Sequence, residues 1–354
     1  MPRRRAVTLA VSGTLLAGFA AGALFQPVPY AELSPGPTFD VLGTQDGTAN
    51  GTPLISINGH PTYPTAGQLR MVTVGVSEES YRMPLGEALV GWLSTDEAIV
   101  PKETIYPAGQ TQQQSDAVNT QEMTDSQDSA VTAALGALGI KPTGSEVVVA
   151  SVTDGSPAAG KLQAGDVINS VDGVAITTGG SAGMSEITAV IEKVTPGQQV
   201  TFEVTRDNKK QSVTTGTEKG SSGKAEVGIS IEGENVFPFT VDIQLNNVGG
   251  PSAGMMFALG IVDKLTPTNL TGGRIIAGTG TIDSSGNVGA IGGIQMKTIG
   301  ARRAGATVFL APAANCAEAK ANQPAGLELV KVNTLQDALT ALTDIREGKT
   351  PSLC

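Results

Sequence analysis

The stretch Asn247–Phe257, Asn-Val-Gly-Gly-Pro-Ser-Ala-Gly-Met-Met-Phe, constrains the fold of this chain more than any other. Two glycines loosen the backbone before Pro251, and an apolar run begins at Ser252. Proline is well suited to the first helical position, so the pattern predicts a loop that turns into a buried helix. Ser252 would then lie at the helix N-terminus, where free N–H groups and the positive end of the helix dipole favour an anion.

Two interpretations of Ser252 are open at this point. It is either an ordinary N-cap of the helix, or a nucleophile whose developing oxyanion meets the surrounding loop at Gly250, Pro251 and Ala253. The chain has one histidine, His60, far upstream in an unrelated stretch, which makes a Ser-His-Asp triad a poor fit. A lysine whose pKa is lowered by burial can activate a serine instead.

Two lysines are candidates for that base. Lys264 follows Ser252 by 12 residues on the same predicted helix, which places it about 18 Å away and out of reach. Lys297 comes after a glycine-rich turn and opens a second helix in a mostly uncharged segment. Desolvation there would lower its pKa toward neutrality, as a general base requires.

The segment Pro251-Ser252-Ala253-Gly254, followed by an apolar helix, resembles the nucleophile segment of Lon-type proteases. Further blocks follow in the Lon order and spacing: Gly278–Ile282, Gly289–Lys297, Arg303–Ala306 and Phe309–Pro312. The resemblance implies a Lon-type α/β proteolytic domain, which we place at residues 225–350, with a catalytic Ser252–Lys297 dyad. It also implies that Thr279 hydrogen-bonds the lysine.

This sequence departs from the Lon pattern at two positions. Gly249 and Thr281 stand where Lon proteases usually carry acidic residues around the active-site loop. The departures bear on regulation of that loop more than on the dyad.

The N-terminus has the pattern of a membrane anchor. Arg3-Arg4-Arg5 precede Ala6–Phe25, which carries no charge over about one bilayer crossing. We therefore expect a transmembrane anchor at residues 1–25, a single-pass protein of the cell membrane, and the bulk of the chain on the extracytoplasmic side. The alternative is a cleaved signal peptide, because Ala21-Gly22-Ala23 fits a small-residue cleavage site.

Charge and cysteine content exclude several classes of function. The net charge is −10 without a long basic cluster, so we expect no nucleic-acid partner. Outside the cytoplasm Cys316 and Cys354 would pair as a disulfide, the alternative being two free thiols. Two cysteines and one distant histidine do not make a zinc site, and we expect no metal and no cofactor.

Residues 26–128 read as a stalk, some strands and a connector. The Pro-rich segment 26–43 predicts a stiff extended stalk, and its Pro-Val-Pro-Tyr and Ser-Pro-Gly-Pro-Thr also resemble the start of membrane-anchored Lon-like proteases that carry a PDZ domain. Strands are expected at 54–57 and 69–76, packed against the proteolytic domain. Residues 108–128, rich in Gln, Ser, Thr and Asp, predict an exposed connector.

Residues 129–219 resemble a bacterial PDZ domain. The pattern combines a strand at Glu146–Val152, a Gly-Ser-Pro-Ala turn, a Val-Asp-Gly hairpin and an amphipathic helix at Ser185–Val194. Such a domain adds an extended peptide to a sheet edge beside a helix. The expected groove residues are Glu146, Val147, Val148, Ile187, Val190 and Ile191. The alternative is a spacer with an unused groove.

Together these patterns predict an α+β chain with an N-terminal transmembrane helix, a PDZ-like β-rich domain and a Lon-type α/β proteolytic domain. No Gly-x-x-x-x-Gly-Lys-Ser/Thr motif occurs, so we expect an ATP-independent, membrane-tethered serine endopeptidase that cuts unfolded or extended segments. The alternative function is an inert PDZ scaffold of the cell envelope. The Lon resemblance further implies a ring-shaped homo-oligomer as a partner state.

Overall fold

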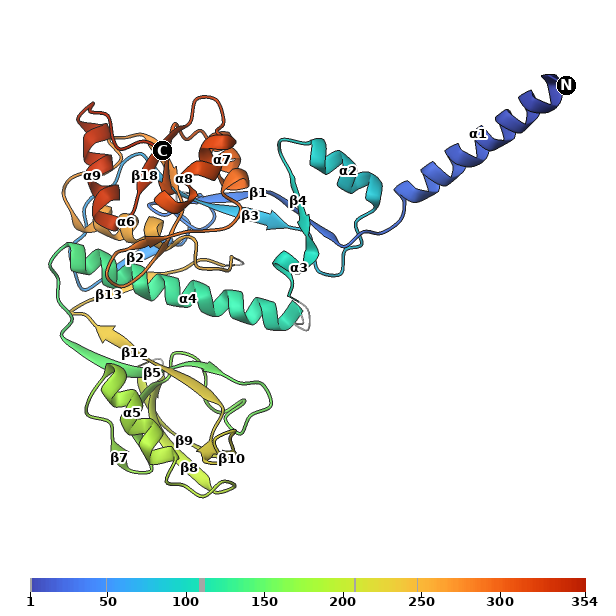
Figure 1. Ribbon diagram of the computed structural model, residues 1–354. Helices are drawn as coiled ribbons and strands as arrows, with labels where there is room; N and C mark the ends of the chain where they lie inside the picture. Colours follow the sequence, from blue (N-terminus) through green and yellow to red (C-terminus); the bar gives the residue numbers. More distant parts are fainter. Residues whose placement is uncertain (1, 49, 108–111, 207, 247) are drawn as a thin grey trace. The chain divides into compact units, whose positions relative to one another are not determined.

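The computed structural model describes residues 2–48, 50–107, 112–206, 208–246 and 248–354 (Figure 1). Three predicted features fall partly outside the described residues: Asn247 of the segment around Ser252, residues 108–111 of the connector, and Asp207 of a turn that Arg206-Asp207-Asn208 predicts between two strands. The chain divides into two compact units. Unit 1 comprises Met1–Ser56, Thr62–Ala134 and Asp242–Cys354, and unit 2 comprises Ile57–Pro61 and Leu135–Val241.

Unit 1 is built on a six-stranded mixed sheet. Its order is β18 (Glu328–Val332), β17 (Val308–Pro312), β14 (Ile275–Gly278), β3 (Gln68–Val76), β1 (Tyr30–Asp40) and β4 (Ala98–Pro101). The first four strands run parallel to one another. Strand β1 pairs antiparallel with β3, and β4 pairs antiparallel with β1. The early and late parts of the sequence therefore share one sheet, which agrees with the expected packing of the early strands against the proteolytic part.

Helices cover both faces of this sheet. On one face α7 (Ile294–Arg303) and α8 (Cys316–Ala321) contribute to a buried cluster with strand residues that include Ala277. The next residue along β14, Gly278, points the other way and lies against α6 (Gly254–Leu265), where an added Cβ would sit 2.7 Å from the Met256 sulfur. The last helix, α9 (Leu335–Arg346), packs against α6 and β18.

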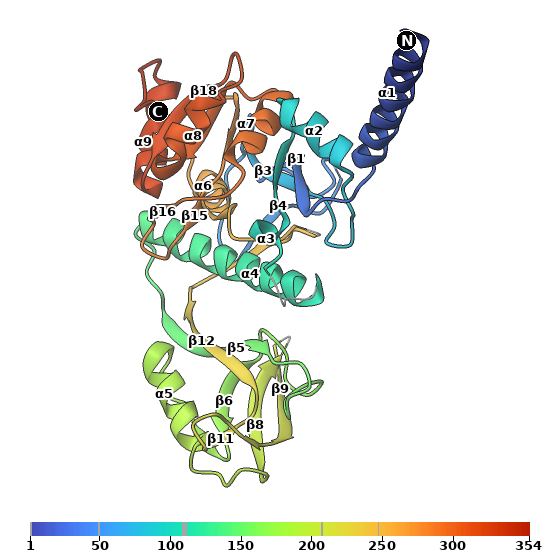
Figure 2. The same ribbon diagram turned by 45° about the vertical axis from the view of Figure 1, so that its right-hand side comes forward.

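The other described elements of unit 1 are shorter or lie at its ends. They are α1 (Pro2–Leu24), α2 (Leu85–Leu93), α3 (Lys102–Ile105), α4 (Gln112–Ala137), β15 (Thr281–Ile282), β16 (Val288–Gly289) and the 3-10 turn Ala313–Asn315, while β2 (Ile55–Asn58) and β13 (Thr240–Ile243) lie where the chain passes between the units. Helix α4 is one long helix that starts in unit 1 and ends just inside unit 2 (Figure 2).

The predicted transmembrane helix is wrong. The segment does form a helix, α1, but in the part of the chain that the structure describes no helix combines the length and apolarity that a bilayer crossing demands. The sequence argument counted uncharged residues, whereas insertion depends on apolar area. Alanine, glycine, serine and threonine make up much of this helix, and each adds little apolar area.

The predicted stalk at residues 26–43 is also wrong. Most of it is β1, an interior strand that pairs with β3 on one side and β4 on the other. Prolines are tolerated there because the ladder with β3 shifts register between Pro35 and Thr38, as a bulge does. Gly36 fills that bulge, and an added Cβ would collide with Thr73.

The predicted connector at 108–128 is mostly helical. Helix α4 begins at Gln112. The helical spacing of small apolar residues at 129–138 predicts a separate short helix, but this stretch is the last part of α4, which ends at Ala137. Its composition is polar because most of its surface is exposed, while a narrow buried seam holds it to unit 1: Met123, Ser126, Ala130, Ala133 and Ala134. Tertiary packing along this seam overrides the weak local signal.

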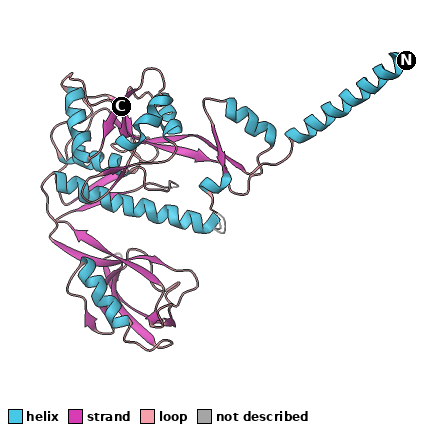
Figure 3. Cartoon of the chain, viewed as in Figure 1, coloured by secondary structure: helices cyan, strands magenta, loops and turns pink. Residues whose placement is uncertain are grey.

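Unit 2 is a β-rich domain with one main helix (Figure 3). Its sheet has the order β12 (Ile229–Val236), β5 (Gly144–Val152), β6 (Val167–Val171), β8 (Gln199–Arg206) and β9 (Lys209–Gly216), with β7 (Val174–Ala175) beside β6 and a separate pair, β10 (Glu218–Lys219) and β11 (Ala225–Glu226). Helix α5 (Gly180–Ile191) closes the core through Ile187, which is fully buried with Val149 and Phe202. Arg206 forms an ion pair with the buried Asp166, at 2.6 Å.

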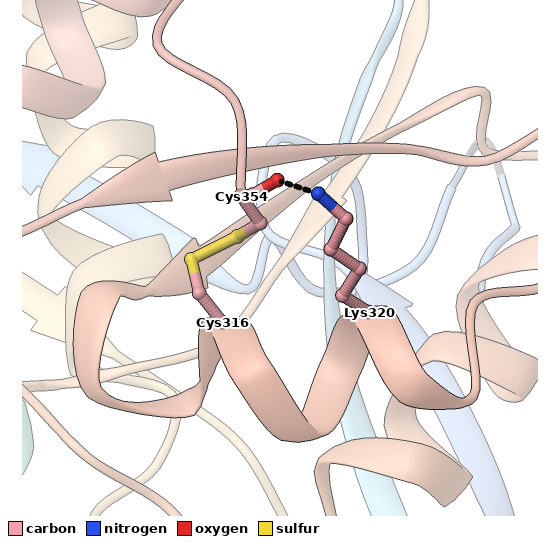
Figure 4. The surroundings of a disulfide bond; sticks show 3 residues. All are labelled: Cys316, Lys320 and Cys354. Carbon is pink, nitrogen blue, oxygen red and sulfur yellow. Dashed lines mark hydrogen bonds between the residues drawn. A yellow bond between two sulfur atoms is a disulfide. The ribbon is translucent and has the colours of Figure 1, made fainter.

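Cys316 and Cys354 form a disulfide across 38 positions of the sequence (Figure 4). The side chain of Lys320 donates a hydrogen bond of 2.9 Å to the Cys354 carbonyl oxygen, and the Cys354 N–H donates to Leu329 in β18. These contacts fasten the segment after α9 to α8 and to the edge of the sheet.

Candidate active site

Ser252 lies in the turn that leads into α6. The helix begins at Gly254 with Ala253 as its N-cap, three residues after Pro251, which the sequence pattern placed at the first helical position. Gly250 has a φ of +85°, a conformation that favours glycine, and this residue lets the chain turn sharply before Pro251. The result is a half-buried serine on a constrained turn ahead of a fully buried helix.

Lys297 lies in the first turns of α7 and reaches Ser252. Its Nζ is 2.6 Å from Ser252 Oγ, although 45 positions separate the two residues. The lysine is only 4% exposed, and this burial lowers its pKa from 10.5 to about 8. Such an amine is partly neutral near physiological pH and able to accept a proton.

Thr279 joins the two residues. It follows β14 directly and is 1% exposed. Its Oγ1 lies 3.3 Å from Lys297 Nζ and donates a 2.9 Å hydrogen bond to the Ser252 carbonyl oxygen. The Gly280 N–H also donates to that carbonyl, at 2.9 Å, so the backbone of Ser252 is held by the segment that holds the lysine.

The loop predicted to face an oxyanion is only partly available for that role. The Gly250 N–H donates to the Asn119 carbonyl of α4 at 2.8 Å, and Pro251 has no N–H to offer. Within the described residues no acceptor is found for the N–H of Ser252 or of Ala253. These two groups are the remaining candidates for binding an oxyanion.

A cavity of about 420 Å³ opens onto the pair. Its walls are Ser252 and Lys297, the end of β3 around Val72–Val74, and one face of α4 with Asn119 and Met123. A second cavity of about 990 Å³ shares its wall at Val74, Asn119, Met123, Val248 and Gly249 and carries many amide and hydroxyl groups. Beyond Met71 the side of β3 that pairs with β14 has no described strand partner. An extended chain therefore has both space and hydrogen-bonding groups beside the serine.

The strand expected to form the peptide groove of unit 2 is an interior strand of its sheet. Glu146, Val147 and Val148 are in β5, which pairs with β12 along its whole length and with β6 on its other side. Val148 is therefore paired on both sides, and β5 is an interior strand of this sheet. The edge strand of this sheet is β12, and α5 packs against it.

The predicted groove residues of α5 differ in burial. Ile187 and Ile191 are buried in the core of unit 2, while Val190 is partly buried beside it. The sequence assigned the segment that forms β12, Ile229–Val236, to the proteolytic domain, so the domain boundary at 225 is misplaced. The signal that could have corrected this is Val227-Gly228-Ile229, an apolar-glycine-apolar run that leads into β12.

Two further observations concern metal-binding groups and His60. Among the described residues no group of three or more His, Cys, Asp or Glu side chains could hold a metal ion. His60 packs against the ring of Phe239 in unit 2, with 4.7 Å between ring centroids.

Comparison with known proteins adds two likenesses. Residues 121–217 match the family model described as a PDZ domain. The chain is also 40% identical over 100 residues to Lon protease 1 of Sorangium cellulosum, 38% over 93 residues to Lon protease of Clostridioides difficile, and 27% over 183 residues to the archaeal Lon protease of Methanocaldococcus jannaschii.

These matches are partial. They cover 27%, 25% and 47% of this chain and 12%, 12% and 26% of the respective relatives. Among solved structures, the PDZ domain of an SdrC-like protein from Listeria monocytogenes is 28% identical and covers 24% of this chain and 86% of that domain, with a TM-score of 0.22. The chain thus contains a PDZ domain, which implies peptide binding, and resembles Lon proteases over part of its length.

Proposed function

We propose that this chain is an ATP-independent serine endopeptidase in which Ser252 is the nucleophile and Lys297 the general base. One observation carries the proposal: a buried amine with a pKa of about 8 lies 2.6 Å from a serine hydroxyl at the wall of a cavity. The partial likeness to Lon proteases supports the same reaction class.

The reaction follows from the groups that meet there. Neutral Lys297 accepts the proton of Ser252 Oγ as the oxygen attacks the scissile carbonyl carbon. The N–H groups of Ser252 and Ala253 stabilise the oxyanion, the lysine gives its proton to the departing amine, and an acyl ester remains on Ser252. Lys297 then takes a proton from water as the water oxygen attacks the ester carbon, and it returns that proton to Ser252 Oγ when the ester bond breaks and the second product leaves as an acid. Thr279 orients the amine through its hydroxyl.

The substrate we propose is an extended or unfolded protein segment. The two cavities that share a wall can accept a chain without tertiary structure but not a folded domain. The 354 residues contain no P-loop motif for ATP-driven unfolding.

We assign peptide binding in unit 2 to the free side of β12 next to α5. A ligand would extend the sheet by strand addition there, as PDZ domains do. The disulfide Cys316–Cys354 favours an oxidising compartment as the place where the enzyme works.

The test uses an intrinsically unfolded protein and a set of fluorogenic peptides as substrates. We expect purified wild-type protein to cut them without ATP, and Ser252→Ala and Lys297→Met to be inactive. Ser284→Ala, an exposed serine outside the site, is the matched control and should cut at the wild-type rate. Turnover by Ser252→Ala at the wild-type rate would refute the assignment.

A further inference from the structure

We propose that α4 holds the nucleophile loop in its reactive position and that Ser126 is a positioning residue for Ser252. This inference rests on the proposed function and names a residue that touches neither the amine nor the nucleophilic oxygen. It concerns the loop 249–252, where the chain approaches Ser252.

The first contact is a buried hydrogen bond. Ser126 Oγ donates to the Pro251 carbonyl oxygen at 2.9 Å, across 125 positions of the sequence. Ser126 is 4% exposed, so water cannot easily replace it. Because Pro251 immediately precedes Ser252, this bond fixes the orientation of the peptide unit that carries the Ser252 N–H, one of the two remaining oxyanion donors.

The second contact lies two helical turns earlier. The Asn119 carbonyl oxygen accepts the Gly250 N–H at 2.8 Å. Asn119 and Ser126 are seven residues apart, so they lie on the same face of α4. Met123 lies between them, is 5% exposed and lines both cavities. One face of α4 therefore binds the loop at two points and forms a wall of the substrate space between them.

The loop 249–252 and α4 are so closely packed that glycines are needed where they meet. A Cβ added to Gly249 would lie 2.8 Å from Asn119 Cβ, and one added to Gly254 would lie 2.6 Å from Ser126 Oγ. The loop cannot move closer to α4, and the two hydrogen bonds keep it from moving away. At position 249, α4 occupies the space that a side chain would need.

Positioning of this kind matters for rate because displacements of about 1 Å can cost on the order of 100-fold in catalysis. Loss of the Ser126 hydroxyl leaves the Pro251 carbonyl buried without its partner, and the loop gains freedom to turn. The cavity walls remain, so substrate binding should change less than the chemical step.

The experiment compares Ser126→Ala with two control variants on the same helix. Asp125→Asn alters an exposed neighbour, and Ala130→Gly weakens α4 at a buried position whose side chain cannot hydrogen-bond the loop. The readouts are kcat, KM, the melting temperature and amide hydrogen exchange at Gly250. We expect Ser126→Ala to lower kcat at least tenfold with KM within threefold, and to speed exchange at Gly250, whereas both controls keep the wild-type kcat below their melting temperatures.

Other outcomes would refute either the positioning role of Ser126 or the proposed function. A wild-type kcat in Ser126→Ala overturns the positioning role, as does a loss of kcat that Ala130→Gly shares at equal melting temperature. Ser252→Ala is measured beside them. If Ser252→Ala is inactive and Ser126→Ala is fully active, only this inference fails, whereas an active Ser252→Ala refutes the proposed function itself.

Discussion

Lys297 Nζ meets Ser252 Oγ at 2.6 Å although Lys297 belongs to α7 and Ser252 to the turn before α6, two helices on opposite faces of one sheet. They converge beyond the carboxyl end of β14, where Thr279 continues the chain and contacts both. In parallel sheets the carboxyl ends of the strands are the common place for a ligand site. The relationship places a hydroxyl, an amine and a cavity together without any histidine.

Replacement of the nucleophile should abolish turnover. In Ser252→Ala the attacking oxygen is gone, so we expect kcat to fall by a factor on the order of 10⁴ or more. The melting temperature should change little, because Ser252 is half-buried and contributes no large apolar surface. Steady-state cleavage of a fluorogenic peptide and a thermal melt measure both quantities.

The pH dependence of kcat/KM should report the amine. Protonated Lys297 cannot accept the serine proton, so the rate should rise about tenfold per pH unit below the lysine pKa and level off above about 8. Lys264 is the matched control because burial also lowers its pKa, yet its Nζ lies near the Leu42 carbonyl oxygen instead of the serine. A profile whose midpoint moves in Lys264→Arg would contradict the assignment.

Lys297 should also make stability depend on pH. Its pKa is about 8 in the folded chain against 10.5 as the ordinary value, so the unfolded chain binds more protons between these limits and wild-type stability rises with pH there. Below pH 8 the buried charge costs about 3 kcal/mol. Lys297→Met should therefore exceed the wild type in free energy of unfolding most below pH 8, and the difference should shrink toward pH 10.5. Denaturant titrations at several pH values measure both free energies of unfolding. A difference between the two proteins that stays constant with pH would contradict this prediction.

Thr279 should affect catalysis more than folding. Thr279→Val keeps the shape but removes the hydroxyl that contacts Lys297 and donates to the Ser252 carbonyl. We expect kcat to fall roughly 10- to 100-fold, equivalent to about 1–3 kcal/mol for hydrogen bonds lost at a buried site. Thr279→Ser, which retains the hydroxyl, should recover most of the rate, and equal rates in the two variants would exclude the role.

Loss of the disulfide should lower stability without removing activity. The bond Cys316–Cys354 closes a loop of 38 positions, which corresponds to about 3–4 kcal/mol in the chain-entropy model. The double variant Cys316→Ala, Cys354→Ala should melt at a lower temperature yet cut peptides at the wild-type rate at 20 °C or so, since neither cysteine lines the cavity at Ser252. Thermal melts of the wild type with and without a reducing agent give the same comparison without mutation.

The surroundings of Ser252 and Lys297 could be anticipated because their signals are local. Glycine and proline at 249–251 specify a turn, and the apolar run after Ser252 specifies a buried helix. The uncharged neighbourhood of Lys297 anticipated its burial. Its distance to Ser252 could not be read from spacing, because it depends on how both helices cover the sheet.

The errors arose where tertiary partners decide the structure. Pro35 and Pro37 suggested a stalk, but a bulge opposite β3 accommodates them inside a sheet. The polar stretch after Gln112 lacked an apolar stripe because its buried seam is narrow and partly made of small residues such as Ser126. The strand Ile229–Val236 read as the start of a new domain, because its alternating pattern fits any strand and its partner, β5, lies far upstream in the sequence.

The parallel pairing of β3 with β14 brings Gln68 opposite Ile275, with most of unit 2, Leu135–Val241, encoded between them. A ribosome must therefore complete the inserted unit before the central sheet can close, and closure over so long an interval is expected to be slow. Lys297 is synthesised later still. The stretch Leu135–Val241 is therefore complete before Lys297 exists, and the Ser252–Lys297 pair is assembled only near the end of synthesis.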